Sequence, residues 1–530
     1  MNPAAHRAVN LAQLLTQTAR RLPDHTALIH GETRWTWREL DDRVNALACA
    51  LALRGVGRGD CVLVHGANRC EYVQTLFAIW RVGAVIAPTN FRLTPSDVAG
   101  IARTCRPVAI VCEREGAAHA EAIADTVDLP AGVLWMDGPA DDPDAVAAQT
   151  TAVDVPNAPV RVGDHAWYFF TSGTSGAPKA AVLTHDQMGF VVTNHLCDLM
   201  PGTTEADVSL VVAPLSHGAG IHLLPQVAAG AASVLTTSPK LDGAEVWDLV
   251  ERERVTNAFT VPTILKLLAE HPDALRRDHS SLRYVIYAGA PMYATDQRRA
   301  REVLGDVLVQ YYGLGEVTGN ITVLPPRLHD HVSPAGVEIG TCGIPRTGMQ
   351  VAICDDDGTE LPAGEQGEIC VAGPAVCAGY LDNPGANAKA FRDGWFRTGD
   401  LGLLDEHGFL YVTGRASDMY ISGGSNVYPR DIEEKLLQHP AVSHCAVLGM
   451  PDAVWGEVGV AVCVAEPGTV IDVDELTAWL GERIARYKLP RHVFVWDEIP
   501  MSGYGKIVKR TIKAQLEAAT WPPEPVGAAS

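Results

Sequence analysis

The chain has 530 residues, of which 47% are hydrophobic and 20% charged. This composition is typical of a globular protein with ample apolar surface to bury, and at roughly 150 residues per domain it allows three or four domain-sized units. The formal net charge of -21 would repel nucleic-acid phosphates and anionic headgroups. We therefore expect no nucleic-acid partner.

The cysteines and the N-terminus indicate the compartment. The 12 cysteines are scattered, with neither a CxxC pair nor the Cys/His spacing of a zinc site. The first residues lack the apolar core and cleavage pattern of a signal peptide, and no window reaches about 18 uninterrupted apolar residues. We expect a cytoplasmic protein with reduced thiols and no membrane span.

Apolar periodicity organises the first part of the chain. Residues 11–22 and 37–53 carry apolar side chains at helical spacing, which predicts two helices. Residues 61–88 contain a short apolar run, an amphipathic run and a second short apolar run. This alternation predicts a βαβ unit with parallel strands. A Pro/Ala/Asp-rich stretch at 137–162 then predicts an exposed connection.

Continuous apolar runs recur beyond this connection. We expect strands at 167–171, 208–214, 232–237, 257–262, 283–289 and 306–313, with helices that include 244–255 and 295–305. Such runs alternating with helices indicate buried, mainly parallel sheets. In folds of this kind, ligands bind at the carboxyl ends of the strands.

The texture changes in the last third of the chain. From 340 to 411, brief strands are broken by Gly, Pro and Asp-Gly turns, which predicts a small antiparallel sheet or barrel. Beyond 415, helices at 429–438 and 473–485 and strands at 444–450, 457–465 and 492–496 indicate a separate α+β domain of roughly one hundred residues. The fold class is therefore α/β with a small additional C-terminal domain.

Residues 171–179 form the most informative segment, because small and hydroxyl residues directly follow a predicted strand. Their backbone N–H groups, four hydroxyls and Lys179 suit a phosphate cradle. The pattern is not GxxxxGK[ST], so a P-loop NTPase is not implied. A flexible surface turn is the alternative. The residues concerned are Thr171, Ser172, Gly173, Thr174, Ser175, Gly176 and Lys179.

Five ordered motifs, TSGTSGAPK (171–179), YGLGE (312–316), GWFRTGD (394–400), GRASDMYISGGSNVYP (414–429) and GYGKIVKR (503–510), extend along the chain. Together they resemble the adenylate-forming superfamily of acyl-CoA synthetases, carrier-loading adenylation domains and firefly luciferase. The chain looks most like the fatty-acyl and feruloyl-type CoA ligases. These convert a carboxylate, ATP and coenzyme A to acyl-CoA, AMP and pyrophosphate.

The resemblance implies two domains. Residues 1–416 would form an N-terminal domain of two mainly parallel αβ subdomains plus a small β-barrel, which holds the nucleotide and acyl sites. Residues 417–530 would form a mobile α+β cap that carries the catalytic lysine.

The resemblance also assigns roles in the first half-reaction. Lys506 would bridge the carboxylate and the α-phosphate, and Glu316 would hold Mg²⁺, for which a carboxylate is a suitable ligand. Asp400 would accept the ribose hydroxyls, with Arg415 as a neighbouring nucleotide contact. Without the motif context, these charges would be ordinary surface, turn or capping groups.

The adenine would lie between one aromatic residue and a run of small residues. Tyr311 or Tyr312, followed by Gly313, matches the aromatic position. The small run is Ala288, Gly289 and Ala290. The alternative for both segments is sheet core, as their apolar character also allows.

The second half-reaction requires a different group at the same carbon. By resemblance, the cap turns about Ser417, withdraws the lysine and brings Gly423 and Gly424 to a pantetheine tunnel. Glycines suit such a tunnel because they leave room for a thin chain. A simple turn is the alternative for these two glycines.

His217 matches a position at the acyl pocket, where it would orient the carboxylate; a buried structural histidine is the alternative. Gly218, Gly220 and Gly315 would leave volume for the acyl group. Carrier-loading domains for amino acids usually have an aspartate near this position. The segment SHGAG contains none, which favours an amine-free acid.

Three positions depart from the family pattern. Ala180 replaces a common glycine, Gly315 stands where threonine is usual, and Ser417 occupies a hinge that is usually Asp or Lys. Three alternatives to a complete synthetase therefore stay open: an enzyme that thioesterifies an adenylate supplied by a partner, a carrier-loading enzyme, and a nucleotide-binding regulator without turnover. Neither the acid nor the oligomeric state follows from the sequence, and a homodimer is one open alternative.

Overall fold

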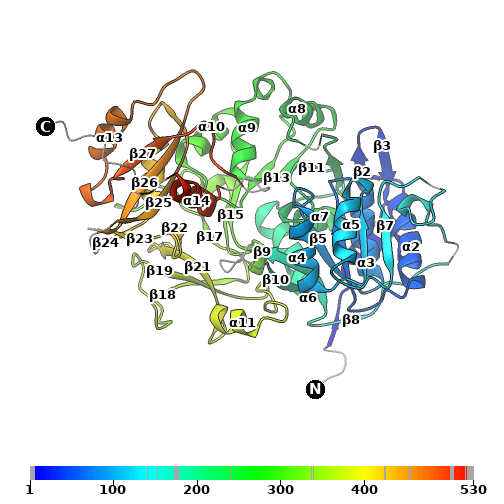
Figure 1. Cartoon of the computed structure of the whole chain (residues 1–530). Coiled ribbons are helices and arrows are strands. Elements are labelled where there is room, and N and C mark those ends of the chain that lie inside the picture. The colour runs from blue at the N-terminus through cyan, green and yellow to red at the C-terminus, as the bar shows by residue number, and fades with distance from the viewer. Residues whose placement is uncertain are drawn as a thin grey trace.

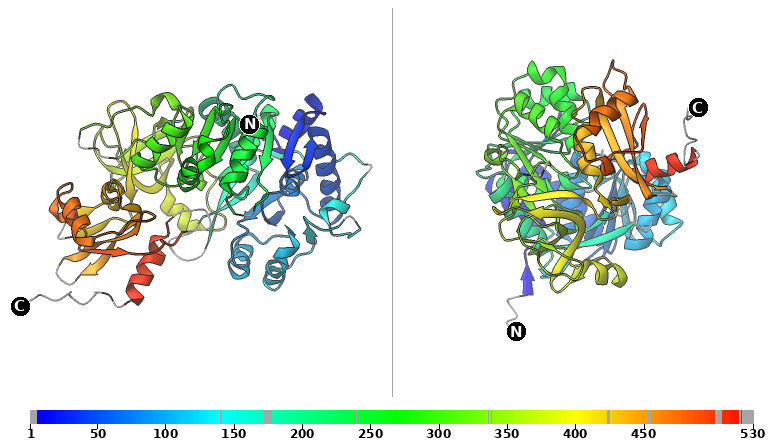
Figure 2. Two further views of the ribbon diagram at one scale, coloured as in Figure 1. Left: turned by 90° about the horizontal axis from the view of Figure 1, so that it is seen from above. Right: turned by 90° about the vertical axis from the view of Figure 1, so that its left-hand side faces the viewer.

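The computed structural model describes residues 6–139, 141–151, 153–171, 178–238, 240–335, 337, 339–422, 425–452, 455–501, 507–519 and 521. The chain runs from a blue N-terminal part, through a green central part, to an orange C-terminal unit at the opposite end of the molecule (Figures 1 and 2). Two large sheets form the first two-thirds of the chain, and a short antiparallel pair, β1 (Arg7–Ala8) and β8 (Val160–Arg161), lies at their edge.

The first large sheet has six strands in the order β10-β9-β5-β4-β6-β7. The predicted βαβ unit is confirmed, because β4 and β5 pair in parallel on either side of α3 in the chain. The elements of this layer are β4 (Cys61–His65), α3 (Cys70–Arg81), β5 (Val85–Thr89), α4 (Pro95–Cys105), β6 (Ala109–Cys112), α5 (Ala117–Ala124), β7 (Gly132–Trp135), β9 (His165–Thr171), β10 (Lys179–Thr184) and α6 (His185–Asn194).

The second sheet has nine strands in the order β17-β16-β15-β14-β13-β11-β12-β2-β3. Its inner strands from β2 to β15 pair in parallel, as the continuous apolar runs predict. Its strands are β2 (Thr26–His30), β3 (Thr33–Thr36), β11 (Val208–Val211), β12 (Ala232–Leu235), β13 (Asn257–Thr260), β14 (Tyr284–Tyr287), β15 (Leu308–Tyr312), β16 (Thr322–Leu324) and β17 (Ile344–Pro345).

Local sequence signals explain where the helices of these layers begin. Helix α2 starts after Thr36, whose side chain accepts a hydrogen bond from the Glu39 N–H while the Glu39 carboxylate accepts one from the Thr36 N–H. Leu40, Val44 and Leu47 then recur at helical spacing and are fully buried. The helices around these sheets are α1 (Ala12–Arg21), α2 (Trp37–Leu53), α7 (Gly218–Ala229), α8 (Gly243–Arg252), α9 (Pro262–Glu270) and α10 (Ala294–Leu304). A π-helical turn, η4 (His195–Leu199), extends α6.

A five-stranded antiparallel sheet follows, as the turn-rich sequence predicts. Strand β22 pairs with β21, outside the main order β18-β19-β21-β20. Its elements are β18 (Gln350–Cys354), β19 (Gly367–Ala372), α11 (Pro384–Ala390), β20 (Phe391–Arg392), β21 (Trp395–Leu404) and β22 (Leu410–Arg415).

The C-terminal unit has its own five-stranded sheet and its own buried cluster around Ile432, Val447 and Leu476. Polar contacts join it to the preceding part: the Ala294 N–H donates to Glu434 Oε1 at 3.0 Å, and Arg430 Nη1 donates to the Val412 carbonyl at 2.6 Å. Its elements are β23 (Tyr420–Ser422), β24 (Ser425–Val427), α12 (Pro429–Leu436), β25 (Val442–Asp452), β26 (Gly456–Ala465), α13 (Val473–Gly481), β27 (His492–Val495) and α14 (Lys509–Ala518).

Two observations concern the cysteine thiols and the helices that could span a membrane. Each of the 12 cysteines is a free thiol. Within the described ranges, no helix has both the length and the apolar content needed to cross a bilayer.

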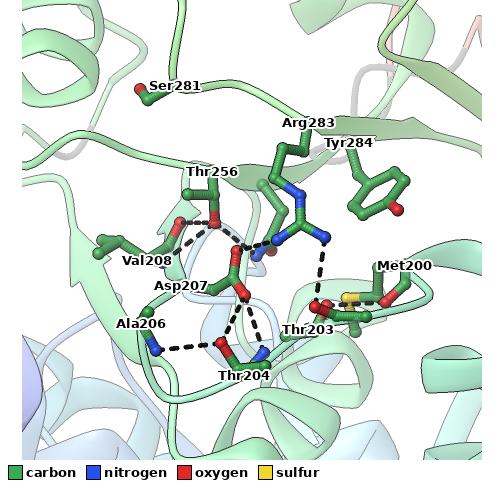
Figure 3. Close-up of polar contacts among 12 residues, drawn as sticks. Met200, Thr203, Thr204, Ala206, Asp207, Val208, Thr256, Ser281, Arg283 and Tyr284 are labelled. Carbon is green, nitrogen blue, oxygen red and sulfur yellow. Dashed lines mark hydrogen bonds and ion pairs between the residues drawn. The ribbon is translucent and has the colours of Figure 1, made fainter.

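A polar clamp ties together the amino-terminal ends of β11 and β14 in the nine-stranded sheet (Figure 3). Asp207, which precedes β11, accepts a hydrogen bond at Oδ1 from Arg283 Nη1, which precedes β14, at 2.8 Å. Asp207 Oδ2 also accepts from the Thr204 N–H at 2.8 Å. The Asp207 side chain is 5% exposed, so the ion pair is shielded from water on the carboxylate side. The clamp lies at the edge opposite the carboxyl ends of the strands.

Replacement of Asp207 by alanine removes the acceptor shared by Arg283 and Thr204. We expect Asp207→Ala to lower the free energy of unfolding by about 1 to 3 kcal/mol, because two hydrogen bonds to a buried carboxylate are lost while both donors stay accessible to water. Urea denaturation followed by circular dichroism would measure the loss. Arg299→Ala breaks an exposed pair with Glu302 (3.5 Å) and should cost less than about 1 kcal/mol. Equal losses in the two variants would contradict the role of the clamp.

Candidate functional site

A cleft of about 2000 Å³ lies at the carboxyl ends of the parallel strands of the nine-stranded sheet. It is lined by residues that end or follow β11, β12, β13, β14 and β15, by the facing ends of β9 and β10, and by the C-terminal unit through Ile507 and Lys509. The expectation that ligands bind at the carboxyl edge therefore coincides with a large cleft of the described chain.

The flanks of the predicted phosphate cradle face each other in this cleft. Thr171 ends β9 and Lys179 begins β10, and the two residues are antiparallel partners. Both line the cleft. The predicted strand before the cradle is confirmed. Ser172, Gly173, Thr174, Ser175 and Gly176 lie outside the described residues.

Glu316 lies beside this hairpin, in the short 3₁₀ turn η6 (Gly315–Val317). Its Oε1 accepts hydrogen bonds from Thr171 Oγ1 at 3.2 Å and from the Tyr380 hydroxyl at 2.9 Å. Lys179 Nζ lies 5.5 Å from the centre of the Tyr380 ring. Burial and the Glu316 carboxylate raise the pKa of Tyr380, so its hydroxyl remains a donor at neutral pH. Tyr380 thus contacts both the Glu316 carboxylate, through its hydroxyl, and the Lys179 ammonium, through its ring.

The donor set around Glu316 is compatible with Mg²⁺. Glu316 is 8% exposed and both of its hydrogen bonds described above go to Oε1. In the described chain, no group of three or more His, Cys, Asp or Glu side chains is placed to hold a metal. A single carboxylate fits a hard cation that keeps several waters and takes its other ligands from substrate phosphates.

Asp400 forms a second polar group in the cleft. Its Oδ2 accepts a hydrogen bond from the Tyr312 hydroxyl at 2.6 Å, and its Oδ1 lies 3.1 Å from Arg415 Nε. Asp400 and Arg415 are cross-strand partners of β21 and β22, which explains their closeness. The Asp400 charge raises the pKa of Arg415, and burial together with Asp400 raises the pKa of Tyr312. This group presents oriented oxygens toward the cleft.

The structure separates the two tyrosines left open by the sequence. Successive side chains of a strand point to opposite faces. Tyr312 reaches Asp400, whereas Tyr311 stacks against Phe259 with ring centres 6.0 Å apart. Ala288, Gly289 and Ala290 follow β14 and line the same cleft. Gly313 permits a close backbone approach, because a Cβ there would lie 2.3 Å from the Gly319 carbonyl carbon.

His217 immediately precedes α7 and lines the cleft. Its ring lies 4.8 Å from the Phe169 ring, centre to centre. Gly315 explains one departure from the family pattern: a Cβ there would lie 2.4 Å from Phe169 Cδ1, so the phenylalanine ring occupies the space that a threonine side chain would need.

The other two glycines of the predicted acyl site differ in position. Gly218 lines the cleft beside Phe259. Gly220 packs instead against the Leu215 carbonyl, because its added Cβ would lie 2.1 Å from that oxygen. Gly220 therefore serves the packing of α7, away from the cleft.

The C-terminal unit reaches the cleft through the start of α14. Lys509 Nζ pairs with Glu433 Oε1 at 2.7 Å, and Glu433 is buried. Ser417 is exposed and lines the cleft. Lys506, Gly423 and Gly424 lie outside the described residues.

Three residues of the site escaped the sequence analysis: Phe169, Phe259 and Tyr380. Tyr380 is 64 positions from Glu316, and no spacing links them. Only the AGY segment after an antiparallel strand marks its neighbourhood. The aromatic pair was indistinguishable from core, because each residue belongs to an apolar strand.

The geometry matches an established family. The AMP-binding enzyme family matches residues 15–381, and the AMP-binding enzyme C-terminal domain matches residues 431–506. The chain therefore belongs to the AMP-binding enzyme family, the adenylate-forming class that its motifs resemble.

Named relatives refine the comparison. The chain is 39% identical over 500 residues to a feruloyl-CoA synthase of Amycolatopsis sp, covering 94% of this chain and 97% of the relative. It is 34% identical over 523 residues to an indoleacetate–CoA ligase of Aromatoleum aromaticum, covering 97% and 99%. The amide bond synthetase McbA from Marinactinospora thermotolerans superposes with a TM-score of 0.86 at 29% identity, covering 96% and 100%.

Replacement of Tyr380 by phenylalanine removes the hydroxyl that donates to Glu316 and keeps the ring beside Lys179. We expect the affinity for ATP in the presence of Mg²⁺ to fall by about tenfold, because a hydrogen bond to a charged group is worth ~1.5 to 3 kcal/mol. Affinity without Mg²⁺ should change less. Calorimetric titration with and without the metal would measure both. Tyr284→Phe, which removes a remote hydroxyl bound to the Pro201 carbonyl, is the matched control. A Tyr380→Phe protein with unchanged metal dependence would refute the link.

Proposed function

We propose that this protein is an AMP-forming acyl-CoA synthetase that activates an amine-free carboxylic acid as an acyl-adenylate and transfers the acyl group to coenzyme A. The acid–thiol ligase class follows from the family and from relatives named as CoA ligases. The observation that carries the proposal is the pairing, in one cleft, of the Glu316–Tyr380–Lys179 group with the Asp400–Tyr312–Arg415 group.

The first group suits the phosphates of ATP. Lys179 supplies positive potential, and Thr171 adds a hydroxyl. Glu316 would hold Mg²⁺, which when bound neutralises charge on the phosphate oxygens. Tyr380 keeps the Glu316 carboxylate oriented, since its hydroxyl donates to Oε1.

The second group suits the nucleoside. Asp400 is a buried carboxylate held by Tyr312 and Arg415, and a carboxylate is the acceptor that ribose hydroxyls require. Arg415 pairs with Asp400 and adds a cation to the same wall of the cleft. The adenine would lie between Tyr312 and the small run Ala288, Gly289 and Ala290, all of which line the cleft.

The acid would approach from the side of His217. One carboxylate oxygen attacks the α-phosphorus, a new P–O bond forms, and the bond to pyrophosphate breaks with the electron pair leaving on pyrophosphate. Lys506 would balance the charge that builds up on the α-phosphate and the attacking carboxylate. His217 would orient the carboxylate beside the Phe169 ring.

In the second step, the deprotonated thiol of coenzyme A attacks the acyl carbon and AMP leaves with the bonding pair. The cap, from residue 417 onward, would turn about Ser417 so that Gly423 and Gly424 admit the pantetheine chain. Such alternation keeps water from the reactive adenylate.

The relatives named as CoA ligases disfavour two of the three alternatives: use of an adenylate made elsewhere, and carrier loading. A panel of free carboxylic acids with ATP, Mg²⁺ and coenzyme A tests all three, with pyrophosphate and thioester followed in parallel. Pyrophosphate together with thioester supports the complete synthetase. Thioester from a supplied adenylate alone, or acylation of a phosphopantetheinyl carrier but not coenzyme A, would overturn it. We place the enzyme in the cytoplasm, in keeping with its free thiols.

Lys506→Ala tests the division of labour between the two half-reactions. We expect acyl-adenylate formation to fall by about 10² to 10³-fold, since a charge aimed at the transition state is lost. Thiolation of a supplied acyl-adenylate should change much less. Pyrophosphate exchange and thioester release measure the two steps separately. Equal losses in both assays would contradict the assignment of Lys506 to the first step alone.

Gly424→Leu tests the tunnel. A leucine side chain would fill the space that a pantetheine chain needs, so we expect thioester formation to be blocked while pyrophosphate release on the first turnover is kept. Single-turnover assays with and without coenzyme A distinguish the steps. An unaltered thioester yield would count against the tunnel.

A further inference from the structure

Two aromatic rings close the side of the cleft beyond His217. Phe259, at the end of β13, and Tyr311, in β15, stack with ring centres 6.0 Å apart and planes inclined by 18°. Both line the cleft, yet Phe259 is only 6% exposed and Tyr311 9%. We call this pair the end wall. Phe169, beside His217, is the third ring of the same pocket.

Each ring of the end wall rests on a glycine. A Cβ on Gly218 would lie 2.6 Å from Phe259 Cζ, and a Cβ on Gly319 would lie 2.5 Å from Tyr311 Cε2. These short distances from a hypothetical Cβ show that each ring packs directly against the glycine backbone. Because core side chains packed in this way have few alternative rotamers, the end wall is a fixed boundary rather than a flexible one.

A layer of buried polar groups lies behind the end wall. The His222 ring is centred 6.0 Å from Phe259, and His222 Nε2 is 3.0 Å from Asn257 Oδ1, which also accepts from Gln226 Nε2 at 3.0 Å. The His195 ring is centred 6.4 Å from Tyr311, and its Nδ1 is 3.2 Å from Nη2 of the buried Arg346. Burial lowers the pKa of His222 to about 4, so it is neutral at pH 7.

This layer opposes any apolar chain that passes the rings. An alkyl chain entering this layer would separate buried groups that are hydrogen-bonded to one another. Each donor or acceptor left without a partner carries a desolvation penalty. The pocket therefore combines flat aromatic walls with a closed polar backing, and such walls favour a planar ring over a long flexible chain.

We propose that the acid activated by this enzyme is compact, with one planar ring or a chain of similar reach, and that the Phe259–Tyr311 pair sets this limit. The proposal rests on the acyl-CoA synthetase function proposed above. Long-chain fatty acids are excluded because the end wall stops them short of the polar layer.

The experiment compares kcat/KM for benzoic, cinnamic, octanoic and hexadecanoic acids in the wild type and in two opposed variants. Phe259→Leu should lengthen the pocket. We expect it to raise kcat/KM for octanoic acid relative to that for benzoic acid by about tenfold, because accommodating a few additional methylene groups is worth that much. Gly218→Ala should push the Phe259 ring into the cleft and lower kcat/KM for cinnamic acid relative to that for benzoic acid. Phe77→Leu, in the fully buried helix α3, is the matched control for loss of an aromatic ring and should leave the acid profile unchanged.

Three results would overturn the proposal while leaving the synthetase function intact: efficient use of hexadecanoic acid by the wild type, an unchanged acid profile in folded Phe259→Leu, and the same profile shift in Phe77→Leu. Thermal melting confirms that each variant is folded, and if Phe259→Leu unfolds, Gly218→Ala alone decides. Absence of both pyrophosphate and thioester with every acid would instead refute the proposed function itself.

Discussion

Antiparallel pairing of β9 with β10 is the constraint on which the site depends. It sets Thr171 directly opposite Lys179 at the mouth of the cleft. From this hairpin, hydrogen bonds and one cation–ring contact extend through Tyr380 to Glu316, which belongs to a turn far along the chain. A change in the register of the hairpin by one residue would turn both side chains to the opposite face. Sheet pairing therefore fixes the positions of Thr171 and Lys179 in the cleft.

Close contacts between glycines and aromatic rings shape the part of the cleft near His217. Gly315 beneath Phe169 and Gly218 beneath Phe259 are two instances of one device, in which an absent Cβ admits a large ring. The ring then occupies volume that a substrate would otherwise take. Gly315 departs from the family pattern, and the structure shows a packing reason for it: the missing hydroxyl is accompanied by a ring in the same place.

The cleft also resolves an apparent conflict between overall charge and substrate. The protein has a net charge of -21, whereas ATP and coenzyme A are polyanions. Lys179, Arg415 and Lys509 all line the cleft, so the local potential there is more positive than the average surface. Two of these cations are held by the buried acids Asp400 and Glu433, which keeps them aimed and leaves the remaining acidic surface free to repel other anions.

The sequence by itself determined the parallel sheets, the antiparallel insert and the C-terminal α+β unit, because each leaves a local period of apolar residues. It also determined the family and the order of the motifs that supply Thr171, Glu316 and Asp400. The hairpin β2–β3 escaped, since its strands are short and weakly patterned. Only the tertiary structure decided that Tyr312 contacts Asp400 while Tyr311 stacks on Phe259, that Gly220 supports a helix, and that Tyr380 contacts Glu316. These facts depend on which strand face meets which distant backbone, and a linear pattern does not contain that contact.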